Sequence, residues 1–170
     1  MIKHLALPVS LIAACLLVSC AEQPKAIVSR SLGHRISKVR TTAYSHTEKG
    51  GKHNAIGTYL SGRQVMSAAS DWSRYPLGTR FRLVDTNEEY VIDDYGTALI
   101  GTNTIDLYKP SRLDMKRWGV RHVDIDILQW GSKEQSLKVL TPRAKHQSVR
   151  RMIVALQKKT SGRPSGSAVD

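Results

Sequence analysis

The chain is poor in cysteine. Among its 170 residues only Cys15 and Cys20 are cysteines, and both lie within the first twenty positions. The residues after Cys20 therefore contain no thiol and can form no disulfide. An exported domain without disulfides must be stabilised by its hydrophobic core or by a closed sheet.

Long hydrophobic runs are also missing, apart from Leu5–Val18 near the start of the chain. This run is too short to span a bilayer comfortably, and it follows a short, weakly basic start, so it predicts a secretory signal peptide in residues 1–19. The residues Leu17-Val18-Ser19-Cys20 resemble a bacterial lipobox. That resemblance implies cleavage before Cys20 and lipidation of Cys20. The alternative is an ordinary signal peptide that happens to contain a cysteine.

Localisation follows from the same segment. Ala21 occupies the position after the cysteine, where an Asp would resemble an inner-membrane retention signal. We therefore expect an outer-membrane lipoprotein that faces the periplasm and contacts the membrane through its lipid anchor.

Acidic residues are scarce: 14 Asp and Glu stand against 26 Lys and Arg. The imbalance is greatest in residues 132–170, which hold nine basic and two acidic residues. An exported chain rarely meets nucleic acid, so we expect no nucleic-acid partner. Anionic wall polymer or lipid headgroups fit the basic segment better, and a solvated tail kept soluble by its charge remains an alternative.

Several chemical signatures are missing as well. The sequence has no glycine loop for phosphate, no nucleophile elbow and no zinc signature. His46 and His53 share a polar loop but lack the tight spacing of metal ligands. We therefore expect neither a cofactor nor a metal.

What is present is a series of short β-prone runs separated by turns. Ser111 and Gly119 delimit one short helix as N-cap and C-terminal glycine, and Val149, Met152, Ile153 and Leu156 recur at helical spacing in a second. Many strands and few helices predict a compact β-barrel. The expected strands are 39–44, 65–69, 80–84, 90–93, 104–108 and 120–128.

The domain organisation follows from these patterns. We expect a signal peptide (1–19), a lipidated tether (20–36), a barrel domain (37–131) and a basic C-terminal extension (132–170). The extension should contain one short amphipathic helix followed by a disordered tail rich in Gly, Ser and Pro.

Between Val39 and Leu128 the chain carries a series of short motifs in a fixed order. They are Thr42-Ala43-Tyr44, the strand before Asp71, Pro76-Leu77-Gly78-Thr79, Asp94-Tyr95-Gly96 with Gly101, Ile105-Asp106-Leu107-Tyr108 and Lys116-Arg117-Trp118-Gly119-Val120. This set resembles the three-aspartate (3D) domain family, which includes membrane-bound lytic transglycosylase A and is related to rare lipoprotein A and the expansins. The resemblance implies a mainly all-β fold, a six-stranded double-psi β-barrel with one or two short helices. It also implies a cluster of Asp71, Asp94 and Asp106, with Asp106 as the acid/base.

The chemistry of carboxylates agrees with such a role. A free Asp has a pKa of about 3.9, so an acid that works at neutral pH needs a pKa raised by roughly two to three units, through burial or a like charge. Asp106 lies between Ile105 and Leu107 on a predicted strand, and Asp94 is its natural neighbour. A lytic transglycosylase, as the resemblance implies, uses the C6 hydroxyl of the sugar as the nucleophile, so one proton-transfer group suffices.

We therefore expect a lytic transglycosylase-like enzyme that cleaves the glycan strands of peptidoglycan, with Tyr95, Gly96 and Thr104 as substrate-binding residues. Tyr95 is the best candidate for stacking on a sugar. Asp93 is expected to be a bystander, and Asp124 and Asp126 to form the solvated face of a strand. Two alternatives remain: an expansin-like module that binds peptidoglycan without cleaving it, and a structural lipoprotein that links the outer membrane to the wall.

Overall fold

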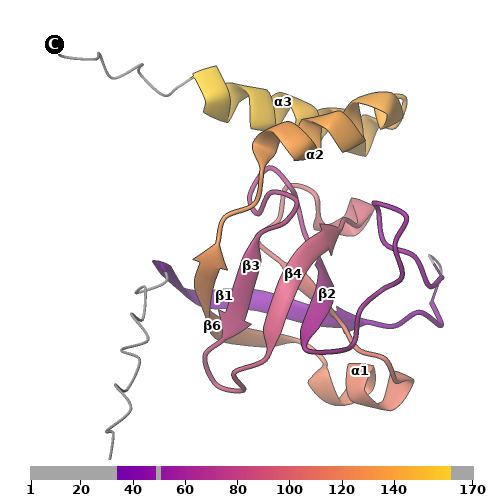
Figure 1. The fold of residues 1–170 in the computed structure, drawn as a ribbon, viewed down its shortest axis with the longest axis vertical. Coiled ribbons are helices and arrows are strands. Elements are labelled where there is room, and N and C mark those ends of the chain that lie inside the picture. The colour runs from indigo at the N-terminus through magenta and orange to yellow at the C-terminus, as the bar shows by residue number, and fades with distance from the viewer. Residues whose placement is uncertain (1–33, 49–50, 162–170) are drawn as a thin grey trace, which may run out of the picture.

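The computed structural model describes residues 34–48 and 51–161, and six of its strands close into a barrel (Figure 1). Their order around the barrel is β1-β5-β2-β4-β3-β6. The pairs β1·β5 and β2·β4 are parallel and the other four are antiparallel. The predicted mainly-β, six-stranded barrel is confirmed, and it carries three short α-helices where one or two were expected. The strands are β1 (His34–Tyr44), β2 (Val65–Ala69), β3 (Arg80–Leu83), β4 (Glu89–Asp94), β5 (Ile105–Tyr108) and β6 (Arg121–Gln129).

Alternating burial along the strands explains why they form a barrel. In β6 the side chains of Val123, Ile125 and Ile127 are buried in the core. Asp126 lies on the other face, where Arg35 Nε donates to its Oδ1 at 2.8 Å, and Asp124 accepts from the backbone N–H of Lys38 at 2.9 Å. The prediction that these two aspartates lie on the outer face of the strand is confirmed, because one side of each strand packs and the other is solvated.

The first helix, α1 (Arg112–Trp118), begins and ends where the sequence predicts. The Ser111 side chain accepts from the backbone N–H of Asp114 at 3.0 Å. Gly119 ends the helix with a φ of 61°, a left-handed value that favours glycine. Trp118 is buried, and its indole Nε1 donates to the Thr41 hydroxyl at 3.2 Å, which fixes the helix against β1.

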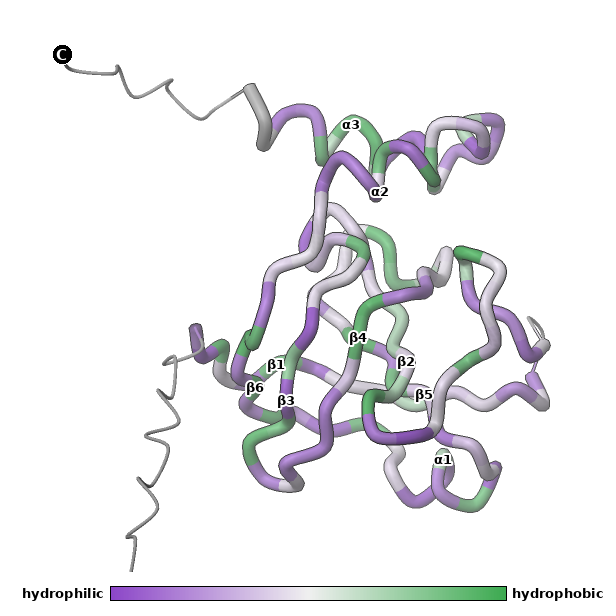
Figure 2. Tube along the Cα trace, viewed as in Figure 1, coloured by the Kyte–Doolittle hydropathy of each residue, from purple (hydrophilic) through white to green (hydrophobic). Residues whose placement is uncertain are grey.

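The C-terminal extension folds into two helices, of which the sequence predicts only the second. α3 (Gln147–Ser161) carries the expected apolar stripe, with Val149, Met152 and Leu156 buried. α2 (Lys133–Leu140) and the short 3-10 helix η2 (Thr141–Arg143) precede it. Figure 1 shows α2 and α3 together at one end of the barrel, and in Figure 2 hydrophobic and hydrophilic residues alternate along both. Up to α3, the extension is therefore part of the folded unit.

The connection between the barrel and α2 is tight. The backbone N–H of Ser132 donates to Leu77 O at 2.9 Å, and the backbone N–H of Leu77 donates to Ser136 Oγ at 2.9 Å. A Cβ at Gly131 would overlap the backbone carbonyls of Pro76 and Leu77. Glycine is needed at this position because the two backbones approach too closely for any side chain.

The predicted signal peptide and the lipidation site at Cys20 lie outside the described residues. Within residues 34–48 and 51–161, no helix combines the length and the apolarity needed to cross a bilayer.

The contact at Gly131 gives a first prediction. Gly131→Ala should lower the free energy of unfolding by about 3 kcal/mol, because overpacking against backbone cannot be relieved by side-chain rotation. Denaturant unfolding followed by tryptophan fluorescence measures this change. Gly96→Ala is the matched control: Gly96 has a φ of −120° and its Cβ would meet only the Leu99 side chain, at 3.4 Å. An equal effect of both substitutions would contradict the prediction.

Candidate functional site

The register of four neighbouring strands places two of the predicted aspartates in one row. Thr42 of β1 is paired with Asp106 of β5, Asp106 with Ala69 of β2, and Ala69 with Asp94 of β4. Residues paired in this way point to the same face of a sheet. Asp106 and Asp94 therefore flank Ala69, with Cα atoms about 10 Å apart by the usual strand spacing.

A β-bulge brings Asp94 into this row. The register of β2 against β4 shifts between Ala68 and Ala69: Ala68 is paired with Ile92, and Ala69 with Asp94. In a regular strand Asp94 would share a face with the fully buried Ile92. The extra residue, Asp93, re-aims the end of β4, so Asp94 leaves the core face and lines a cavity.

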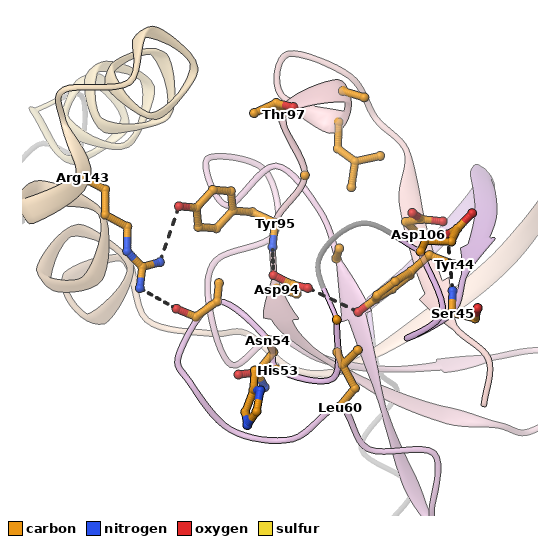
Figure 3. A pocket seen from close by; sticks show the side chains of 17 residues that line it. Tyr44, Ser45, His53, Asn54, Leu60, Asp94, Tyr95, Thr97, Asp106 and Arg143 are labelled. Carbon is orange, nitrogen blue, oxygen red and sulfur yellow. Dashed lines mark hydrogen bonds between the residues drawn. The ribbon is translucent and has the colours of Figure 1, made fainter. Parts of the chain in front are cut away.

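That cavity holds about 620 Å³ and is lined by both Asp94 and Asp106 (Figure 3). The loop between β1 and β2 forms one wall, and the segment after β4, with the 3-10 helix η1 (Thr97–Leu99), forms another. Ala69 contributes only a methyl group between the two carboxylates, which leaves the space open. Other lining residues are Tyr44, Glu48, His53, Asn54, Tyr95, Gly96 and Arg143.

Burial sets the protonation of Asp94. The pKa of its carboxyl is raised to about 6, chiefly by burial and further by the neighbouring charge of Asp93. The backbone N–H of Tyr95 donates to Asp94 Oδ1 at 2.8 Å and opposes part of this rise. The Tyr44 hydroxyl lies 3.5 Å from Oδ2, a long contact. Asp94 thus carries a proton over part of the range between pH 5 and 7.

Asp106 is also half-buried, and this burial raises the pKa of its carboxyl, with a further contribution from the charge of Glu48. The Thr42 hydroxyl donates to Asp106 Oδ1 at 2.6 Å and stabilises the ionised form. The two carboxyls also act on Tyr44 between them, whose pKa is raised by burial and then by the charges of Asp94, Asp93 and Asp106. The Tyr44 phenol is therefore neutral and can act as a hydrogen-bond donor.

Asp71 lies elsewhere. It is buried, with 3% of its surface exposed, and does not line the cavity. Its Oδ1 accepts from the backbone N–H of Ser73 at 2.8 Å, and its Oδ2 accepts from that of Gly101 at 2.7 Å. Since both oxygens accept from backbone N–H groups, Asp71 orients the loop after η1, and it lines a separate cavity with Arg74 and Arg151. The predicted cluster of three aspartates is here a pair.

Of the three predicted substrate-binding residues, two line the cavity and one does not. Tyr95 and Gly96 line the cavity. Tyr95 is half-buried, and its ring and that of Trp72 lie in a T-shaped arrangement with centroids 5.1 Å apart. Thr104 is buried outside the cavity lining, where its hydroxyl accepts from Arg40 Nη1 at 3.0 Å. Thr104 therefore positions the start of β5.

Asp93, expected to be a bystander, supports the cavity wall. Its Oδ2 accepts from Ser67 Oγ at 2.6 Å and from Asn54 Nδ2 at 2.9 Å. Asn54 in turn holds the loop through its Oδ1, which accepts from the backbone N–H of Thr58 at 2.9 Å. Burial raises the pKa of Asp93, and the hydrogen bonds from Ser67 and Asn54 oppose that rise.

Arg143 is a lining residue that no sequence motif identifies. It belongs to η2, in the extension that the sequence presents only as basic. Its Nη2 donates to Ala55 O at 2.7 Å, and its guanidinium lies over the Tyr95 ring, 5.9 Å from the centroid. No local pattern marks Arg143, because its approach to the cavity depends on the path of α2.

Metal ligands do not gather in the part of the chain that the structure describes: no three His, Cys, Asp or Glu side chains there form a group suited to a metal ion. The two loop histidines contact tyrosines. His46 Nδ1 is hydrogen-bonded to Tyr108 OH at 2.9 Å, and the His53 ring lies 4.4 Å from the Tyr59 ring.

A scan against protein-family models and a search of curated proteins both gave no match. The resemblance to three-aspartate domains thus depends on the motifs quoted above, and the chemistry of the cavity has to be argued from its own residues.

The raised pKa of Asp94 predicts a pH-dependent effect of Asp94→Asn. Because the folded-state pKa of about 6 exceeds the ordinary value, the protonated carboxyl favours folding, and this contribution is lost as the pH rises through 6. Asparagine mimics the protonated form, so the variant should gain about 2 kcal/mol in unfolding free energy, relative to wild type, between pH 4 and pH 7. Denaturant titrations at both pH values measure it. A difference that does not change with pH would contradict the assignment.

Proposed function

We propose that this protein cleaves the glycosidic bonds of peptidoglycan glycan strands in the manner of a lytic transglycosylase. The observation that carries the proposal is the row Asp106–Ala69–Asp94, which brings two half-buried carboxyls from separate strands to one cavity of about 620 Å³. Pockets of this size accept small ligands and saccharide units.

The proposed reaction needs one proton carrier. Asp106 in its acid form donates a proton to the leaving glycosidic oxygen as the C1–O bond breaks. The C6 hydroxyl of the same sugar then attacks C1 and returns its proton to Asp106, which leaves a 1,6-anhydro ring. Positioned acid/base groups of this kind contribute about 10²–10⁴-fold, and the burial that raises the pKa of Asp106 favours its acid form.

In this proposal Asp94 and Tyr44 assist the proton carrier. Asp94, with a pKa of about 6, keeps a negative charge close to the cationic sugar ring in part of the molecules. Tyr44 remains a neutral donor beside both carboxyls. Tyr95 is half-buried at the cavity wall, so part of its ring can stack on a sugar face. Gly96 has no side chain, so a saccharide can approach its backbone closely.

We also propose lipid anchoring at Cys20, in the outer membrane and facing the periplasm. The support is the lipobox-like Leu17-Val18-Ser19-Cys20 and the absence of an Asp at position 21. This location gives the cavity access to peptidoglycan, and no nucleic-acid partner is proposed.

A binding function without cleavage is the second candidate, and one contact favours it. The 2.6 Å hydrogen bond from Thr42 stabilises the ionised form of Asp106, which opposes proton donation. In an expansin-like module the same cavity would hold a saccharide through Asp106 as an acceptor.

Product analysis separates the two functions. Purified protein incubated with peptidoglycan should release 1,6-anhydro muropeptides, detected by mass spectrometry, and Asp106→Asn should reduce the rate at least 100-fold because it removes the proton. Asp85→Asn, on an exposed turn, is the matched control and should retain the wild-type rate. Retention of glycan without release, in both wild type and Asp106→Asn, would favour the binding module.

The anchor has its own test. In a bacterial host fed a labelled fatty acid, the protein should incorporate label and sediment with the outer membrane, whereas Cys20→Ala should lose the label and appear in the soluble periplasmic fraction. Cys15→Ala is the control and should behave as wild type. Labelled Cys20→Ala protein would overturn the proposed site.

A further inference from the structure

Arg143 is held in place by packed structure rather than by a loose tail. Leu140 and Val149, on either side of it in the sequence, are fully or nearly fully buried in the hydrophobic core. The helix before it is attached to the barrel through Ser132 and Ser136. The guanidinium therefore reaches the cavity wall from a pre-organised position, which lowers the cost of ordering it on ligand binding.

The charge of Arg143 has no carboxylate partner. Within residues 34–48 and 51–158, no ion pair includes Arg143. The two hydrogen bonds given for its side chain go to neutral oxygens, Ala55 O at 2.7 Å and Tyr95 OH at 3.4 Å. A guanidinium has five N–H donors, so donors remain for a ligand.

The cavity is polarised as a result. Glu48, Asp94 and Asp106 contribute carboxyls, and Arg143 is the one Arg or Lys among its described lining residues. Figure 3 shows Arg143 and Tyr95 on one side of Asp94, with Tyr44 and Asp106 on the other. A ligand with an acidic substituent would be repelled at the carboxyl side but held at Arg143, which prefers planar carboxylates and binds them with two hydrogen bonds.

We propose that Arg143 is a specificity-determining residue that binds a carboxylate of the saccharide ligand. This inference rests on the proposed function, from which it takes peptidoglycan as the class of ligand. In peptidoglycan a carboxylate comes from one of two sources, the free lactyl group of a peptide-free muramic acid or the peptide stem attached to that group. Both present the same anion, and Arg143 separates such strands from neutral glycans.

The test compares charged and neutral ligands of one shape. Full-length protein in detergent is titrated by calorimetry with a tetrasaccharide of alternating N-acetylglucosamine and N-acetylmuramic acid that bears free lactyl carboxylates, and with its methyl ester. A second pair carries peptide stems, with the stem carboxylates free or amidated. In one of the pairs, the free acid should bind about 10–100-fold more tightly than its neutral form, as a charge-assisted hydrogen-bonded pair provides. The pair that shows the preference identifies the source of the carboxylate.

Variants assign the preference to Arg143. Arg143→Gln should weaken binding of the acid to the level of the neutral form and leave the neutral form unchanged, and Arg143→Lys should retain part of the preference. Arg150→Gln, on α3 with contacts to Ala144 O and Lys145 O, is the matched control and should bind as wild type. A purely structural role of Arg143 would weaken acid and neutral ligands equally, and that result overturns the inference.

The outcomes also separate this inference from the proposed function. Release of 1,6-anhydro products without a charge preference in either pair overturns the role of Arg143 and leaves the cleavage intact. A charge preference that depends on Arg143, without any release, supports the inference and removes the catalysis. The comparison of acid and neutral ligands in wild type does not depend on whether a variant folds.

Discussion

The candidate site depends on the pairing register of β1, β5, β2 and β4. A slip of one residue would turn Asp106 toward the core and Ala68, instead of Ala69, toward the cavity. The bulge before Ala69 is part of the same constraint, since without it Asp94 would face inward with Ile92. Closure of the barrel holds this register from both sides, because no strand of the row is a free edge.

Burying these carboxyls opposes folding, and the rest of the fold offsets it. The raised pKa values of Asp93, Asp94 and Asp106 all have burial as their main cause. Hydrogen bonds from Ser67, Asn54 and Thr42 recover part of the cost. The hydrophobic core offsets the rest of this free-energy cost. Its largest fully buried side chains include Trp72, Tyr90 and Phe81. Such a balance is typical of functional sites, where groups are held in environments that stability alone would not select.

The C-terminal extension contributes to the cavity because its helices pack against the barrel. In sequence it is a basic segment with one apolar stripe. In the structure α2 and α3 pack at one end of the barrel, and the turn between them brings Arg143 beside Tyr95 and Ala55. Gly131 makes this possible, because its backbone lies against Pro76 and Leu77 where a side chain has no room. A domain that ended at β6 would lack Arg143, and with it the positive charge that Arg143 contributes to the cavity wall.

Local structure follows from the sequence alone. β2 and α1 begin and end within a residue of their predicted limits, because strand alternation, the Ser111 cap and the Gly119 turn act over a few neighbouring residues. The sequence also placed Asp106 on a strand and Asp94 directly after one, where both could contribute to a shared site. Which polar groups meet depends on the tertiary fold. Asp71 accepts from backbone N–H groups and Thr104 from Arg40, whereas Arg143 lines the cavity and Asp93 supports its wall through Ser67 and Asn54. Strand register, a β-bulge and helix docking bring together residues far apart in the chain, and no local sequence pattern encodes those distances.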